Sequence, residues 1–205
     1  MSARRPLRRG WLLAPAALLL GLGLWQVGAG VYIHAKAVLA QMLLQHAWDR
    51  TLAGEERMRP WPWADTWPVA RLTAPAHGVD LIVLDGASGR ALAFGPGHLD
   101  GSAEPGAVGA ALISAHRDTH FGFLADLASG DALALQTADG RVHAYRVAGT
   151  DIVDYRDAAI PSDPAASSLT LVTCYPFDAV VPGGPLRYLV HAVEAAPARP
   201  ALASR

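Results

Sequence analysis

The sequence predicts an all-β fold, a closed or nearly closed barrel of about eight strands with short helices, preceded by one N-terminal transmembrane helix. Three observations support this prediction. An uncharged apolar run lies near the N-terminus, at residues 11–33. Beyond residue 66, short apolar stretches alternate with turn signals. Little helical periodicity separates these stretches, which favours a barrel over βαβ units.

The composition excludes several classes of protein. The chain has 205 residues, of which 52% are hydrophobic and 17% charged, and this balance opposes an intrinsically disordered chain. A formal net charge of -1 opposes a protein that binds nucleic acid by neutralising phosphates. The single cysteine excludes an intramolecular disulfide framework and a cysteine-rich structural zinc site.

The N-terminal region predicts a membrane anchor. Residues 1–10 form a basic tail with four arginines, whereas all 18 acidic residues lie beyond position 48. A helix over residues 11–33 is long enough to cross about 30 Å of hydrocarbon. The positive-inside rule then predicts a cytoplasmic N-terminus and an exported C-terminal domain. A cleaved signal peptide is the alternative, but its apolar core usually has only about 7 to 15 residues, so we favour a retained signal anchor.

Residues 34–66 are predicted to connect the anchor to the barrel. Apolar residues at helical spacing predict a short juxtamembrane helix from Val38 to Arg50. From Arg57 to Pro68, three prolines and three tryptophans predict an extended linker. We expect the tryptophans to pack against the domain or to lie at the membrane interface.

The barrel domain is predicted to cover residues 67–197, followed by a C-terminal tail at 198–205. The predicted strands are Val69–Leu72, Val79–Leu84, Ala91–Phe94, Ala107–Ser114, Ala132–Thr137, Arg141–Val153, Ser168–Cys174 and Arg187–Ala195. Asp139-Gly140 lies between two of these stretches and predicts a hairpin turn. The apolar spacing at Phe121–Ala128 predicts one or two helical turns.

Three residues with reactive or charged side chains are predicted to lie at strand ends. Cys174 ends an apolar run, and Tyr175-Pro176 breaks the strand directly after it. An unpaired thiol in an exported domain favours a functional role, although free cysteines are often buried and inert. His116 follows the predicted strand 107–114, and Arg187 opens the last strand. Nucleophilic acyl transfer needs such a set: a sulfur nucleophile, a proton carrier and a cation for the oxyanion.

Metal and cofactor sites are not predicted. His116 and His120 have the spacing of two zinc ligands, but Arg117 replaces the glutamate of the HExxH motif. No acidic cluster has the spacing of calcium ligands. Asp118 and His120 are secondary candidates near His116: His120 as a spare proton carrier or a support of the loop, Asp118 as a residue that orients His116 or caps the turn. We predict that neither is catalytic.

One motif makes the chain resemble a known family. Thr170-Leu171-Val172-Thr173-Cys174 matches the TLxTC motif of sortases, and His116 and Arg187 match the family's catalytic histidine and essential arginine in order. The resemblance covers residues 67–195. It departs at Ala115, where many sortases have glycine.

Shorter segments resemble a narrower class, the sortases of Gram-negative proteobacteria. These segments are Trp61-Pro62-Trp63-Ala64-Asp65, His116-Arg117-Asp118-Thr119 and Thr173-Cys174-Tyr175-Pro176-Phe177.

The resemblance implies a sortase-like β-barrel and a membrane-bound cysteine transpeptidase. Cys174 would cleave an LPxTG-type C-terminal sorting signal of an exported protein between Thr and Gly, and an unidentified amine would resolve the thioacyl enzyme. His116 would be the general acid and base, Arg187 would stabilise the oxyanion or position the substrate, and Thr173 would line the substrate groove. Two alternatives remain open: a cysteine endopeptidase that uses water, and a non-catalytic, membrane-tethered domain that binds peptides.

Overall fold

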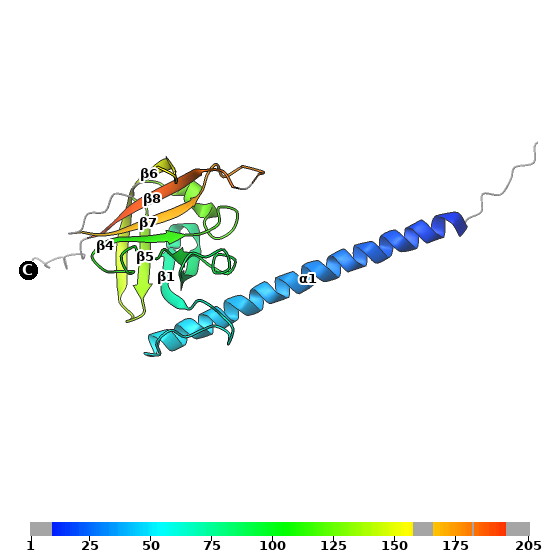
Figure 1. Ribbon diagram of the computed structural model, residues 1–205, viewed down its shortest axis with the longest axis horizontal. Coiled ribbons are helices and arrows are strands. Elements are labelled where there is room, and N and C mark those ends of the chain that lie inside the picture. Colours follow the sequence, from blue (N-terminus) through cyan, green and yellow to red (C-terminus); the bar gives the residue numbers. More distant parts are fainter. Residues whose placement is uncertain (1–9, 158–165, 182, 196–205) are drawn as a thin grey trace, which may run out of the picture. The chain divides into compact units, whose positions relative to one another are not determined.

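The computed structural model describes residues 10–157, 166–181 and 183–195 (Figure 1). The predicted C-terminal tail and all but the last residue of the basic N-terminal tail lie outside these residues. The chain divides into two compact units, one ending at Gln41 and the other starting at Met42. We describe the two units separately.

Helix α1 (Gly10–Leu52) is one continuous helix of 43 residues. The predicted anchor and the predicted juxtamembrane helix therefore join without a break, because residues 34–37 contain no glycine or proline that would interrupt a helix. From Pro15 onward, α1 is long and apolar enough to cross a membrane, a property that signal sequences share.

Within the described residues, eight strands close into a barrel, as predicted. The strands are β1 (Pro68–Ala74), β2 (Val79–Asp85), β3 (Gly97–His98), β4 (Gly109–Ser114), β5 (Ala132–Thr137), β6 (Val142–Asp154), β7 (Ser167–Cys174) and β8 (Leu186–Glu194). Their order around the barrel is β1-β2-β3-β4-β7-β8-β6-β5, and β5 pairs with β1 to close it. The pairs β2–β3 and β4–β7 are parallel, and the other pairs are antiparallel.

The predicted strand at Ala91–Phe94 is wrong. This stretch forms hydrogen-bonded turns, in which the Leu92 N–H donates to the Ser88 carbonyl at 2.9 Å. Ala91 is buried because it packs in a small cluster with Trp48 near the end of α1. The apolar signal therefore arose from packing against a helix, and the third strand of the barrel is the two-residue β3 instead.

Two 3₁₀-helices lie between the strands. Helix η2 (Gly122–Asp126) falls within the helical turns predicted at Phe121–Ala128. Helix η1 (Pro75–His77) was not predicted, and it ends at Gly78, whose φ of 64° is in the left-handed region.

Alternating side chains of the strands fill the barrel. In β1, Ala70, Leu72 and Ala74 are fully buried, and the residues between them are partly exposed. Leu169 and Leu171 of β7 join the same core cluster. In β7 the inward face therefore carries the odd-numbered residues, which places Cys174 on the outward face.

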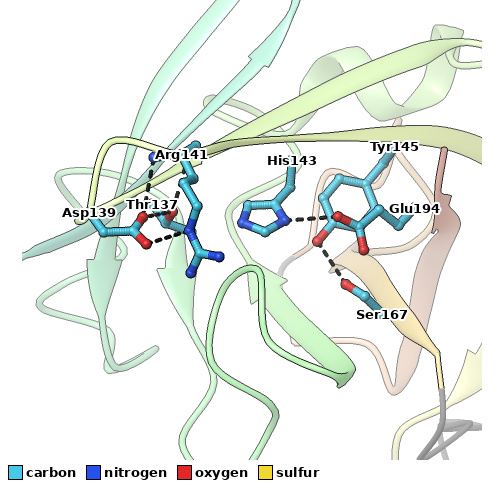
Figure 2. Close-up of polar contacts among 7 residues, drawn as sticks. All are labelled: Thr137, Asp139, Arg141, His143, Tyr145, Ser167 and Glu194. Carbon is cyan, nitrogen blue, oxygen red and sulfur yellow. Dashed lines mark hydrogen bonds and ion pairs between the residues drawn. The ribbon is translucent and has the colours of Figure 1, made fainter. Parts of the chain in front are cut away.

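The hairpin between β5 and β6 forms at Asp139-Gly140, as predicted (Figure 2). The Thr137 N–H donates to the Arg141 carbonyl at 2.9 Å, and Gly140 has a φ of 83°. The Asp139 carboxylate accepts hydrogen bonds from the Thr137 hydroxyl and from Arg141. These hydrogen bonds hold the pKa of Asp139 at about 2, and they keep the turn closed when the carboxylate is ionised.

Polar residues also gather at the end of the barrel where β7 begins (Figure 2). His143 Nδ1 lies 2.8 Å from an oxygen of Glu194, and the Tyr145 hydroxyl lies 3.3 Å from that of Ser167. Burial raises the pKa of Tyr145. Cys174 lies at the other end of β7, so this cluster does not contribute to the candidate site.

Candidate active site

Cys174 and Arg187 face each other across two neighbouring strands. Cys174 is the last residue of β7 and is half-buried. The antiparallel register of β7 and β8 pairs it directly with Arg187. Directly opposed residues in such a pair have Cα atoms about 4.5 to 5.5 Å apart, and their side chains leave the same face of the sheet. The two residues therefore share the outward face of the barrel wall.

His116 lies on the other side of Cys174. Strand β4 runs parallel to β7, with Ser114 beside Val172. The Ala115 N–H continues this register by donating to the Val172 carbonyl at 3.2 Å. This hydrogen bond holds Ala115, the residue before His116, beside the end of β7. His116 is exposed, as suits a residue that must reach a substrate.

Cys174 and Arg187 are paired across β7 and β8, and the His116 segment is tied to β7 through Ala115. Within residues 10–157, 166–181 and 183–195, neither His116 nor Arg187 forms a hydrogen bond with the Cys174 sulfur. Catalytic hydrogen bonds often tighten only once substrate is bound.

Arg187 is held by its own loop and by an aromatic ring. Its Nη1 donates to the carbonyls of Gly184 at 2.8 Å and of Leu186 at 2.9 Å. Its guanidinium carbon lies 4.7 Å from the centre of the Tyr155 ring. No local signal singles out Tyr155, because only the pairing of β6 with β8 brings it next to Arg187.

Thr173 points away from Cys174 and into the barrel wall. It is 1% exposed, and its hydroxyl donates to the Ala115 carbonyl at 2.7 Å. This bond joins β7 to the residue just before His116. The placement does not support the predicted role of Thr173 in lining the substrate groove, and it suits a residue that holds the His116 segment beside Cys174.

Replacing Thr173 with valine should expose the importance of this hydrogen bond. The change keeps the shape of the side chain but leaves the Ala115 carbonyl without its donor, so we expect a loss of about 1 to 3 kcal/mol in the free energy of unfolding. Thr173→Ser, which keeps the hydroxyl, should lose less. Denaturant unfolding of the full chain in detergent measures both, and a Thr173→Val variant as stable as the wild type would contradict the assignment.

The secondary candidates have different surroundings. Asp118 is exposed, and within the described ranges it forms no ion pair with His116. His120 is half-buried; burial lowers its pKa, and the nearby His116 lowers it further. His120 is therefore held toward its neutral form. Neither side chain contacts Cys174, and the prediction that they are not catalytic stays a prediction.

The loop after Cys174 is tied to its surroundings by contacts that sequence reasoning missed. Arg117 Nη2 donates to the Ala179 carbonyl at 2.7 Å, which links the His116 segment to this loop. The ring of Tyr188 contacts those of Tyr175 and Phe177, at 6.1 Å and 5.2 Å between centres. The aromatic residues Tyr175 and Phe177, which follow closely after Cys174, were the available signal. These contacts hold the segment after Cys174 against β8 and the His116 segment.

Among the described residues, no three His, Cys, Asp or Glu side chains group closely enough to hold a metal ion.

The fold is a closed barrel in which Cys174 and Arg187 are paired at neighbouring strand ends, and comparisons with known proteins identify its family. The sortase domain model matches residues 72–195. Sortase D of Bacillus subtilis (strain 168) is 34% identical over 121 residues, which are 58% of this chain and 60% of that protein. The chain belongs to the sortase family, whose members are generally cysteine transpeptidases.

Solved structures agree with this assignment. Sortase A from Corynebacterium diphtheriae superposes with a TM-score of 0.59 and 28% identity, over 65% of this chain and 63% of that one. A Clostridium perfringens sortase C, solved with the C-terminal cell wall sorting motif, has a TM-score of 0.57 and 20% identity, over 78% and 90%. The matches thus cover less than two thirds of the Bacillus and Corynebacterium proteins, and the Clostridium match supports the fold alone.

Proposed function

We propose that this protein is a membrane-anchored cysteine transpeptidase. It cleaves an LPxTG-type C-terminal sorting signal of an exported protein between Thr and Gly, and it transfers the protein to an amine. The observation that carries the proposal is the strand register, which pairs Cys174 of β7 with Arg187 of β8, together with the hydrogen bonds that hold Ala115, the residue before His116, beside β7. Membership of the sortase family supports the reaction class, and the match of residues 170–174 to the TLxTC motif supports the substrate class.

The three side chains account for each step of the reaction. The Cys174 thiolate attacks the threonine carbonyl carbon, and the Arg187 guanidinium stabilises the resulting oxyanion. As the C–N bond breaks, His116 donates a proton to the leaving glycine amine, and a thioester remains on Cys174. The acceptor amine then gives a proton to His116 and attacks the thioester. The new amide forms, and the thiolate is released.

The location is proposed from the N-terminal region. Helix α1 is apolar enough to cross a membrane, and four arginines precede it in the sequence. By the positive-inside rule, these features favour a cytoplasmic N-terminus and a catalytic domain outside the inner membrane. The segments around Trp61, His116 and Cys174 favour the Gram-negative proteobacterial class of sortases.

A peptide assay tests the proposal. The full chain in detergent micelles is incubated with an LPxTG peptide, with and without candidate amines such as oligoglycine, and the products are identified by mass spectrometry. We expect a ligated product whose yield rises with amine concentration. Cleavage without any ligated product would favour the endopeptidase alternative, and an intact peptide under all conditions would favour the non-catalytic peptide-binding domain.

A further inference from the structure

Tyr155 lies just beyond the end of β6, next to the strand that carries Arg187. In the β6–β8 register, Val153 is opposite Arg187, so Tyr155 follows two residues later on the same face. The Tyr155 N–H donates to the Pro185 carbonyl at 3.1 Å, which fixes its backbone to the loop before Arg187. Tyr155 is 57% exposed. Tyr155 is therefore placed on the outward face of the barrel wall, where the candidate site lies.

Arg187 stacks on the Tyr155 ring. Its guanidinium carbon lies 4.7 Å from the ring centre, within the range of a cation–π interaction. Asp154, the acidic residue at the end of β6, is hydrogen-bonded to Arg156. Hydrogen bonds from the side chain and the backbone of Arg156 hold the pKa of Asp154 at about 2, and the charge of Arg187 contributes a smaller lowering. In the part of the chain that the structure describes, Arg187 forms no ion pair.

The difference between a ring and a carboxylate matters for oxyanion stabilisation. A carboxylate would accept the N–H donors of Arg187 and neutralise its charge, so it would compete with a developing oxyanion. An aromatic ring attracts the face of the guanidinium. The N–H donors lie in the plane of the guanidinium, so they stay free to donate hydrogen bonds elsewhere. Only Nη1 donates to the backbone within the described residues, which leaves Nε and Nη2 available.

We propose that Tyr155 is a positioning residue that holds the Arg187 guanidinium beside Cys174 by cation–π stacking and leaves its free N–H donors for the substrate oxyanion. This inference rests on the proposed transpeptidase function. The ring does not touch the reacting atoms, and it acts only through Arg187.

Kinetics of Tyr155 variants test the proposal. In the peptide assay, Tyr155→Leu keeps an apolar side chain but removes the π face, and we expect kcat/KM to fall about 3- to 30-fold. The fall should appear mainly in kcat, because the oxyanion exists only after attack. Tyr155→Phe and Tyr155→Trp should retain most of the activity. In an Arg187→Ala background, Tyr155→Leu should cause no further loss. Trp63→Leu, which removes another exposed aromatic residue, is the matched control.

A second measurement does not depend on activity. The ring current of Tyr155 should shift the Arg187 Nε–Hε resonance of the full chain in micelles, and Arg187→Lys identifies that resonance. We expect Tyr155→Leu to abolish the shift and Tyr155→Phe to keep it. If Tyr155→Leu unfolds the chain, Tyr155→Gln serves as the second variant.

The outcomes separate the two proposals. A wild-type chain without activity on the peptide overturns the proposed function, while the resonance shift still decides whether the stacking exists. An active wild type with an unchanged kcat in Tyr155→Leu, or the same loss in the Arg187→Ala background, overturns the role of Tyr155. A loss in Tyr155→Phe equal to that in Tyr155→Leu also overturns it, because phenylalanine keeps the π face.

Discussion

Cys174→Ala is expected to abolish formation of the thioacyl enzyme and to lower the rate of peptide cleavage by about a thousandfold or more. Among the described residues, Cys174 is the nucleophile that the β7–β8 register pairs with Arg187. Mass spectrometry of the wild type mixed with substrate and little amine should show a covalent adduct, and the variant should show none.

The single cysteine makes this experiment unambiguous, because every thiol adduct must lie on Cys174. Cys174 is half-buried at the end of β7, so the variant should fold, and its thermal unfolding provides the control for folding. Cys174→Ser keeps the size of the side chain, but a hydroxyl ionises far less readily than a thiol, so this variant should also be inactive. Unchanged processing of an LPxTG-bearing protein in cells that express Cys174→Ala would overturn the enzyme assignment.

Gly97→Ala is expected to destabilise the barrel by about 3 kcal/mol or more. Gly97 lies in β3, between Leu84 of β2 and Ser114 of β4. A Cβ atom at this position would lie 2.3 Å from the Gly86 carbonyl oxygen and 3.0 Å from the Ala87 Cα. Both are backbone atoms, so they cannot move away as easily as the end of a flexible side chain can. Relief of the clash would separate β3 from β2 and open the barrel wall next to the His116 segment.

Gly89→Ala is the matched control, since a Cβ at Gly89 would meet no atom within 4 Å. Denaturant unfolding of both variants in the full chain gives the two losses in free energy of unfolding. The Gly97 variant should also lose transpeptidase activity before it unfolds fully. Gly97 pairs with Ser114 at the end of β4, and His116 follows Ser114 by two residues, so displacement of β3 should disturb the His116 segment. Equal stability of the two variants would contradict the prediction, because it would show that the backbone near Gly86 can shift to accommodate the added Cβ at little cost.

Local signals predicted most of the barrel, and the errors came where packing between distant segments decided the structure. The hairpin at Asp139-Gly140 was predictable because the turn chemistry lies within a few residues. The stretch Ala91–Phe94 was mistaken for a strand because its apolar residues pack on the end of α1. The two-residue strand β3 has too few residues to show a period, and it exists only because β2 and β4 offer it partners.

The candidate site shows the same distinction between features that local sequence predicts and features that only the packing of distant segments decides. Sequence alone identified Cys174, His116 and Arg187, because each is a chemically distinctive residue at the end of an apolar run and the TLxTC motif sets their order. Their roles in catalysis stay predictions until the experiments above are done. Tertiary structure alone decided that Thr173 faces inward to Ala115 and that Tyr155 lies under Arg187. Those placements depend on which strands pair and in which register, and register is set by contacts between segments far apart in the chain.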